Sequence, residues 1–393
     1  MSTFQESSSH STILKADKLQ LLFDALLKSG WHIIGPVVED QAIVYDEIED
    51  VGQLPKGWTD LQRPGEYRLK KEDTPTYFKF NASPHSWKKF LHPPKVKLFS
   101  ATRTEKGFSI QPEEKEPPKN AFFGVLPCDL KAVSIQNTVF LKGSFKDTIY
   151  KKNHDNTLII ATNCTNSGGT CFCTSMGAGP EAKSGFDLCL TEMYSDEGHY
   201  FYIEVGSAKG QEIADLLPPS KATKAHAEAK ASVLEKNGKT ISDNKFLDTN
   251  GLKEIFQENQ GESHWREVGE RCLNCANCTM ACPTCFCTTI EDVTDLTGDH
   301  AERWRRWDSC FTMDFSFIHG GFIRPGSSTR YRHWITHKLA NWQDQFGEQG
   351  CVGCGRCITW CPAGIDIVEE AIALRKSASK KDNTSLSAAQ GVE

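Results

Sequence analysis

The segment CLNCANCTMACP, residues 272–283, sets the organisation of the last third of this 393-residue chain. Its four cysteines follow the spacing C-x2-C-x2-C-x3-C, and a proline comes directly after the fourth. Residues 351–362, CVGCGRCITWCP, repeat both the spacing and the proline. A loop with two residues between cysteines wraps three corners of an iron–sulfur cubane, while in paired sites the fourth cysteine binds the other cluster. The duplicated motif therefore predicts two [4Fe-4S] clusters.

The position of the fourth cysteine in each motif predicts how the ligands are shared. Zinc is the alternative metal, because C-x2-C pairs also build four-cysteine zinc sites. A zinc ribbon, however, uses two such pairs for each ion, whereas here three evenly spaced cysteines and a more distant fourth occur twice. We expect one cluster to be bound by Cys272, Cys275, Cys278 and Cys361, and the second by Cys351, Cys354, Cys357 and Cys282.

Composition limits the other possibilities. The formal net charge of −6 gives no reason to expect nucleic acid as a partner. No run of eighteen apolar residues is present, so no membrane span is predicted. The beginning of the chain, MSTFQESSSHST, lacks an apolar signal core, and we expect a cytoplasmic location. In that reducing compartment, metal binding explains 16 cysteines better than disulfides do.

The first half of the chain alternates between strand and helix patterns. Leu19, Leu22, Phe23, Leu26 and Leu27 share one face of a predicted helix. Apolar runs predict strands, and a helix pattern follows the run AFFGVLP. This alternation predicts an α+β or α/β sheet domain, with the strand directions left open. The predicted strands are HIIGPVV, QAIVYDEI, AFFGVLP, TLIIAT and HYFYIEV.

Shifts in composition predict the domain boundaries. We expect an N-terminal sheet domain over residues 13–217, followed by a helical linker over 218–261 that is rich in Pro, Ala and Lys. Residues 262–376 are predicted to form a mainly helical, dicluster ferredoxin-like domain organised around metal. Residues 1–12 and 377–393 are polar and Ser-rich, and we expect them to be disordered.

Four further cysteines follow predicted strands in the first domain. Cys128 lies between the strand AFFGVLP and a helix, where backbone amides and the helix dipole stabilise a thiolate. Cys164 ends the strand TLIIAT, and the turn NSGG leads from it to Cys171 and Cys173. Loops at strand ends commonly present ligands. These four residues predict a third [4Fe-4S] cluster, with zinc binding or simple packing as alternatives.

The remaining four cysteines lie outside these sets. The pentapeptide TCFCT occurs at residues 170–174 and again at 284–288, directly after the first motif. Cys285, Cys287 and Cys310 are candidates for additional ligands, for a site shared between the domains, or for packing beside a cluster. Cys189 lies in the apolar run FDLCLTEM, which favours a packing role.

Cations are concentrated between the two motifs. Such residues either balance the negative charge of a thiolate-bound cluster and raise its potential, or pack their stems on nearby tryptophans at the surface. A third use is the docking of an acidic partner. The residues concerned are Arg303, Arg305, Arg306, Arg324, Arg330, Arg332 and Lys338.

These motifs together resemble the iron–sulfur β subunit of cytoplasmic NAD(P)-linked [NiFe] hydrogenases, the sulfhydrogenases. They equally resemble the iron–sulfur electron-transfer subunit of anaerobic sulfite reductase. The resemblance rests on the two cysteine motifs with WDSC, RYRHWITHK, GVLPCDLKA and NCTNSGGTCFCTSMGAGP, and it departs at residues 218–245, which are unusually rich in Ala and Lys. It implies a relay that connects a flavin- and NAD(P)-binding reductase subunit with the small and large subunits of a [NiFe] hydrogenase, or with a sulfite reductase catalytic subunit.

The chain lacks common catalytic motifs, as a relay subunit would. The chain has no Rossmann glycine fingerprint after a strand, no Walker loop, no G-x-S-x-G and no zinc-protease histidine spacing. We therefore expect no catalytic residues and no flavin in this chain. Two alternatives of other classes are a self-contained reductase that uses flavin or a thiol, and a zinc-stapled scaffold without redox function.

Overall fold

The computed structural model describes residues 11–81, 83–113 and 116–389, and its main sheet has seven strands in the order β1-β11-β10-β9-β8-β2-β3. The four strands β2, β8, β9 and β10 are mutually parallel, and antiparallel partners flank them on both sides. The sheet is therefore mixed, which answers the question of strand direction. Its strands are β1 (Ser11–Lys15), β2 (His32–Glu39), β3 (Ala42–Glu47), β8 (Asn120–Val125), β9 (Thr157–Thr162), β10 (Leu188–Ser195) and β11 (Gly198–Val205).

Both faces of this sheet are covered, which explains its apolar strands. Helices α1 (Gln20–Lys28) and α5 (Ala208–Ala214) supply one cover, and the Phe23 and Phe123 rings meet there with centroids 4.8 Å apart. Helices α2 (Lys88–Leu91), α3 (Pro127–Leu141) and α4 (Thr148–Asp155) supply residues to the core that contains Phe122 and Ile159. β8 and β9 are accordingly buried along nearly their whole length, as expected for strands inside a parallel sheet.

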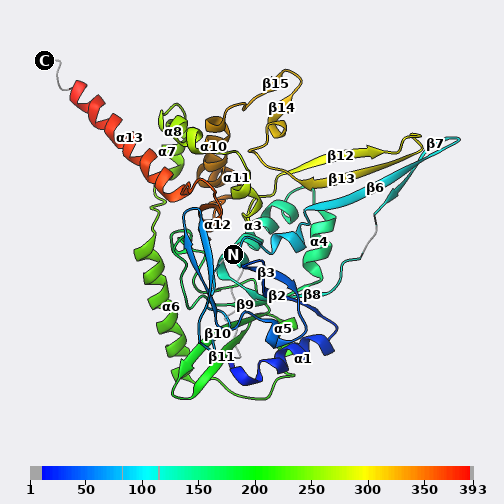
Figure 1. Cartoon of the computed structure of the whole chain (residues 1–393), viewed down its shortest axis with the longest axis vertical. Coiled ribbons are helices and arrows are strands. Elements are labelled where there is room, and N and C mark those ends of the chain that lie inside the picture. The colour runs from blue at the N-terminus through cyan, green and yellow to red at the C-terminus, as the bar shows by residue number, and fades with distance from the viewer. Residues whose placement is uncertain (1–10, 82, 114–115, 390–393) are drawn as a thin grey trace.

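The region around the duplicated motif is mainly helical, and Figure 1 places it at the opposite end of the molecule from α1 and α5. Trp265, Phe311, Trp334 and Leu374 belong to its core. Its helices are α7 (Leu252–Glu258), α8 (His264–Arg271), α9 (Asn277–Met280), α10 (Ser327–Thr336), α11 (Trp342–Phe346), α12 (Arg356–Thr359) and α13 (Ile367–Ala389), with a π-helical turn over His337–Asn341.

The two halves share packing and hydrogen bonds. Phe172 from the first half is fully buried in the helical core of the second. The predicted linker helix forms as α6 (Lys224–Asn244), but it is more than a solvent-facing spacer. Leu234 and Ile241 are buried, and Asn237 donates a hydrogen bond of 2.7 Å to the carbonyl of Cys164.

A second, four-stranded sheet joins distant parts of the chain in the order β12-β13-β6-β7, and it projects from the body as an arm in Figure 1. β6 (Lys95–Thr104) and β7 (Gly107–Pro112) come from the first half, whereas β12 (Thr288–Thr294) and β13 (His300–Trp307) come from the insert between the motifs. The motif region is therefore mainly helical but not wholly so. Two hairpins complete the fold: β4 (Trp58–Arg63) with β5 (Glu66–Lys71), and β14 (Phe317–Ile318) with β15 (Gly321–Phe322).

Parts of both segments predicted to be disordered, residues 11–12 and 377–389, are described by the structure and belong to regular elements. Ser11 and Thr12 belong to β1, because the edge of β11 offers backbone groups that pair regardless of side-chain polarity. α13 continues to Ala389, since a helix anchored by buried Leu374 extends by one hydrogen bond per residue through a segment without glycine or proline. Residues 1–10 and 390–393 lie outside the described residues. No helix in the described part is long and apolar enough to span a membrane.

Candidate iron–sulfur sites

The first predicted ligand set surrounds one cavity. Cys272 directly follows α8, and Cys278 lies in the short helix α9. Cys361 reaches the same cavity from the second motif, and the backbone N–H of Ile365 donates to its Sγ at 3.4 Å. The cavity is lined by Cys272, Cys275, Cys278 and Cys361, by Cys357, and by apolar side chains that include Leu273, Phe311 and Trp334. Four converging thiols with an apolar lining fit a cubane cluster.

The second predicted set also converges. Burial raises the pKa of the Cys357 thiol, and the neighbouring thiolates of Cys351, Cys354 and Cys282 raise it further. The N–H of Gly353 donates to the Sγ of Cys351 at 3.4 Å, as the amides of a cluster-binding loop do. The fourth cysteine of the first motif therefore lies near the loop cysteines of the second.

The two cysteine loops share one backbone conformation although their sequences differ. Residues 274 and 276 of the first loop have φ values of 52° and 66°, and residues 353 and 355 of the second have 64° and 77°. The first loop places Asn and Ala in these left-handed positions, whereas the second uses glycine at both. A Cβ on Gly353 would lie 2.5 Å from the carbonyl oxygen of Phe172. The second loop needs glycine because the first half of the chain packs directly on it.

This packing leads to a stability prediction for the second loop. A Cβ at Gly355 would lie 2.4 Å from Thr170 Oγ1, and the left-handed φ adds strain. We expect Gly355→Ala to destabilise the protein by about 2–4 kcal/mol and to lower its denaturation midpoint. Ala276→Gly, at the equivalent position of the first loop, is the matched control and should change stability by less than about 1 kcal/mol. Equal midpoints for the two variants would contradict the tight packing.

The two copies of TCFCT pack on the segment from Gly350 to Gly355. In the first copy, the N–H of Phe172 donates to the carbonyl of Gly353 at 2.8 Å. In the second, the Oγ1 of Thr284 donates to the carbonyl of Gly350 at 2.8 Å. Thr170 and Thr284 are both nearly fully buried. The first copy thus contacts this segment through its backbone, and the second copy through a threonine side chain. Each copy carries two cysteines next to its contact.

The four first-half cysteines are brought together beside that loop. Burial raises the pKa of the Cys164 thiol, and Cys173 and Cys171 are the thiols that raise it most. For Cys128, burial again comes first, and Cys354 and Cys173 are among the neighbouring groups. Four buried or half-buried thiols therefore lie between the strand ends of β8 and β9 and the second motif.

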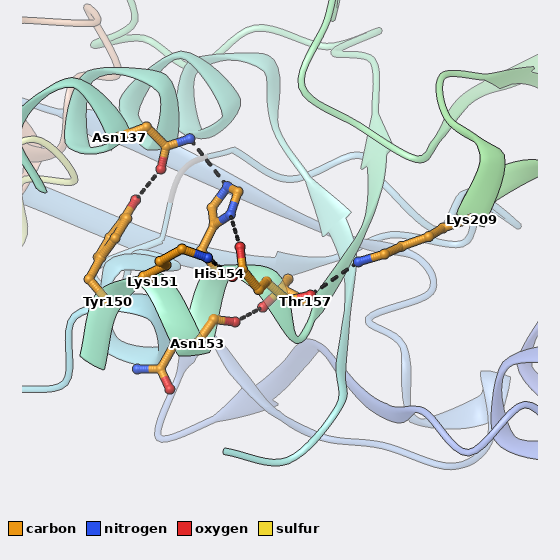
Figure 2. Close-up of polar contacts among 8 residues, drawn as sticks. Asn137, Tyr150, Lys151, Asn153, His154, Thr157 and Lys209 are labelled. Carbon is orange, nitrogen blue, oxygen red and sulfur yellow. Dashed lines mark hydrogen bonds and ion pairs between the residues drawn. The ribbon is translucent and has the colours of Figure 1, made fainter. Parts of the chain in front are cut away.

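Helix α3, which carries Cys128, is held against α4 by a small polar network (Figure 2). Tyr150 donates a hydrogen bond of 2.8 Å to Asn137 Oδ1, and the side-chain amide of Asn137 lies 3.2 Å from His154 Nε2. Burial lowers the pKa of His154, so a neutral ring accepts this hydrogen bond. The network fixes the C-terminal half of α3, through Asn137, against α4.

Lys338 contacts the second ligand set directly. Its Nζ lies 3.2 Å from Cys282 Sγ and 2.8 Å from Thr284 Oγ1, and the side chain is buried. Burial opposes its charge, but the thiolates of Cys282, Cys285 and Cys351 outweigh burial and raise the pKa of Lys338. A buried ammonium beside a cluster ligand stabilises the negative charge that the cluster and its thiolates carry.

The other cations of the insert are used differently. Arg303 and Arg306 form exposed pairs with Asp292 and Glu291 on the arm. Arg330 donates to the carbonyls of Phe311 and Pro325, and Arg332 to that of Gln260. Arg305 pairs with Asp147, and Arg324 lines a polar pocket near His333. These contacts favour structural roles over charge balance for most of the set.

Sequence reasoning missed Arg356, a fully buried guanidinium between Cys354 and Cys357. Its Nη2 lies 2.8 Å from Asp129 Oδ2, and its Nε donates to the carbonyl of Ser83 at 2.8 Å. Asp129 follows Cys128, so this ion pair links the second motif to the third cysteine set. The sequence did offer a signal for this ion pair. Arg356 lies between two cysteines of a cluster-binding loop, and a charged residue inside a buried loop requires a partner of opposite charge.

Within the described ranges, no group of three or more His, Cys, Asp or Glu side chains is arranged to hold a single metal ion. The thiol sets described above are wider arrangements. A cubane spreads its four thiolates over four different irons, so its ligands do not crowd around one centre.

Comparison with known proteins supports the dicluster region. Residues 271–365 match a family model described as a 4Fe-4S dicluster domain. The chain is 29% identical over 348 residues to the sulfhydrogenase 2 subunit beta of Pyrococcus furiosus, which covers 87% of this chain and 92% of that protein. No solved structure matches. The chain therefore carries a [4Fe-4S] dicluster domain, and its resemblance to sulfhydrogenase β subunits is confirmed.

Proposed function

We propose that this chain is the electron-transfer subunit of a cytoplasmic NAD(P)-linked [NiFe] hydrogenase complex, in which it relays electrons between the hydrogenase module and a flavin-containing NAD(P)H subunit. Its dicluster domain and its similarity along most of its length to a sulfhydrogenase β subunit support this assignment. The proposed ligands are the two interleaved sets of the duplicated motif and, for a third cluster, Cys128, Cys164, Cys171 and Cys173.

The observation that carries the proposal is the continuity of the thiol sets. Cys357, a ligand of the second proposed cluster, also lines the cavity of the first. Cys354, from the same loop, is among the groups that act on Cys171 and Cys173 of the third set. When bound, clusters held in this way supply one-electron carriers in sequence. A row of neighbouring sites without catalytic motifs is what a relay requires.

The chain's own residues bind, shield and balance these sites. Phe172 and Phe311 are buried beside the cysteines and exclude water from them. Lys338 and Arg356 are buried cations near the second set: Lys338 contacts Cys282, and Arg356, paired with Asp129, lies near Cys354. At the other end, Cys275 is exposed and Leu273 is 67% exposed, so the first set reaches the surface. We propose this surface as one point of electron exchange with a partner.

The proposed hydrogenase partner has a rival. In an anaerobic sulfite reductase, the same relay would lie beside a sulfite-reducing catalytic subunit. Co-purification from the native cell separates the two, because a nickel-containing large subunit indicates a hydrogenase and a sirohaem-containing subunit indicates a sulfite reductase. Recovery with neither would contradict a relay between these catalysts.

Metal analysis of the isolated chain tests the cofactors. We expect anaerobically purified protein to contain iron and acid-labile sulfide in equal amounts, with about twelve irons per chain for three clusters and about eight for two. EPR of the reduced protein should show interacting clusters. We expect no flavin and no NAD(P)H oxidation without partner subunits. Zinc without sulfide would favour a stapled scaffold, and bound flavin with turnover would favour a self-contained reductase.

A further inference from the structure

Helix α10 separates two cavities. Its Tyr331 and Trp334 line the cavity of the first ligand set, whereas Arg332 and His333 line a second pocket of about 300 Å³. With 3.6 residues per turn, these two pairs lie on opposite faces of the helix. No cysteine lines the second pocket, which we call the α10 pocket. The rest of its lining consists of Gln257, Gln260, Arg324, Thr329, Thr336 and Asn341.

The α10 pocket contains two cations and no carboxylate. Arg324 and Arg332 are both half-buried, and no Asp or Glu is among the described residues that line the pocket. Neither arginine forms an ion pair with a carboxylate in the described part of the chain. Asp344 accepts a hydrogen bond of 2.9 Å from Gln257, but its charge is already paired with Lys253. Two guanidinium groups in one pocket are thus left without a protein anion.

Both guanidinium groups keep hydrogen-bond donors available. Arg332 donates through Nη1 to the carbonyl of Gln260 at 2.5 Å, and this contact holds the side chain at the wall of the pocket. Arg324 lies between β15 and α10, and it donates no hydrogen bond to any described residue. A guanidinium group has five N–H donors in a planar fork. Such forks match the oxygen atoms of carboxylates and phosphates.

Neutral polar groups surround the two arginines. Thr336 directly precedes the π-helical turn His337–Asn341, and Asn341 ends it. On an α-helix these two residues would point about 140° apart. The wider π turn brings both to the α10 pocket, and such turns occur frequently at functional sites. Burial and the neighbouring Arg324 lower the pKa of His333 to about 4, so a neutral imidazole completes this wall at pH 7.

The arrangement of donors identifies the kind of ligand. Two arginines exclude a metal cation, and a lining of amides, hydroxyls and guanidinium groups does not suit an apolar molecule. A carboxylate has two oxygens and fills a single fork, whereas a phosphate group offers three acceptor oxygens and can engage two forks together with neutral donors. The volume lies at the lower end of the range for small-molecule sites, so it leaves room for more than the phosphate group.

We propose that the α10 pocket binds the phosphate group of a small phosphorylated molecule. Arg324 and Arg332 bind the phosphate oxygens, and Thr336 and Asn341 donate further hydrogen bonds to them. The inference goes beyond the proposed function and does not depend on it, because none of the residues that form the pocket is a proposed cluster ligand.

Calorimetric titration of inorganic phosphate into the full-length, anaerobically purified chain tests the site, with ionic strength held constant by sodium chloride. We expect saturable binding that Arg324→Gln weakens about tenfold or more, since a hydrogen bond to a charged group contributes about 1.5–3 kcal/mol. Arg306→Gln, which removes the same charge from an exposed pair on the arm, is the matched control and should leave the affinity unchanged. The absence of phosphate binding, or equal affinities in the two variants, would overturn the site.

A second variant and a second anion make the test independent of one substitution. Asn341→Leu removes a neutral donor and should weaken phosphate binding about two- to tenfold. Acetate should bind far more weakly than phosphate, and equal affinities for the two anions would contradict the phosphate assignment. Arg324→Gln should keep the denaturant midpoint of the unsubstituted chain. A lowered midpoint with unchanged phosphate affinity would show that Arg324 has a structural role only. A chain without iron and sulfide would refute the proposed function, which is a separate result from the phosphate titration.

Discussion

Replacing Cys361 with alanine is expected to destroy the cluster of the first motif and to leave that of its own motif intact. The reason is that Cys361 lines the cavity of Cys272, Cys275 and Cys278, although it follows the loop that begins at Cys351. Cys282→Ala should do the reverse. Removing one of four thiolate ligands typically costs the [4Fe-4S] cluster, so each variant should lose up to about four irons. The measurement is EPR of the reduced protein together with iron analysis.

Paired variants make this test specific. Cys361→Ala should lose the same EPR signal as Cys272→Ala, and Cys282→Ala the same signal as Cys351→Ala. Cys189→Ala is the control, because its buried thiol lies in β10 and away from both loops. If Cys361→Ala instead loses the same signal as Cys351→Ala, each motif binds its own cluster and the interleaved arrangement is wrong.

Replacing Arg356 with methionine should destabilise the chain by about 3–5 kcal/mol. Arg356 and Asp129 are 0% and 1% exposed, so the substitution leaves a carboxylate buried without its cation. Removing one partner of a buried ion pair lowers the free energy of unfolding far more than replacing both partners with apolar residues does. Arg356→Met should therefore lower the denaturant midpoint strongly, and a double variant with Asp129→Leu should recover much of the loss.

An exposed pair provides the control for this prediction. Arg303→Met removes the partner of Asp292 on the arm, where solvent screens the interaction, and should cost at most about 1 kcal/mol. Comparable midpoints for Arg356→Met and Arg303→Met would contradict a structural role for the buried pair. Because Arg356 lies between Cys354 and Cys357, iron content measured in parallel will show whether cluster assembly also depends on this pair.

Much of the architecture could be predicted because it depends on local patterns. The face formed by Leu19, Leu22, Phe23 and Leu26 is buried as helical periodicity requires, and only Leu27 remains partly exposed. The strands AFFGVLP and TLIIAT lie inside the parallel part of the sheet, where both faces are covered and alternation is not needed. These sequence patterns involve residues that are close together in the chain, so they predict helices and strands regardless of how distant segments are arranged.

The pairing of the arm strands could not be predicted from the sequence. β6 and β13 pair although about two hundred residues separate them, and β13 lies in an insert rich in arginine and tryptophan. Neither strand alone reveals its partner, because backbone hydrogen bonds carry no sequence code. The roles of the cations also depended on three-dimensional contacts. Lys338 and Arg356 are buried beside cysteines, whereas Arg303 and Arg306 are on the surface.

Ligand spacing along the chain was enough to identify a two-cluster domain, since short covalent loops limit which thiols reach one cubane. Spatial proximity alone revealed what surrounds those loops: two pentapeptide copies packed on one loop, and a buried guanidinium that joins it to Asp129. These features depend on contacts between segments more than a hundred residues apart. Burial and charge compensation act through space, and they take effect only once the chain has folded.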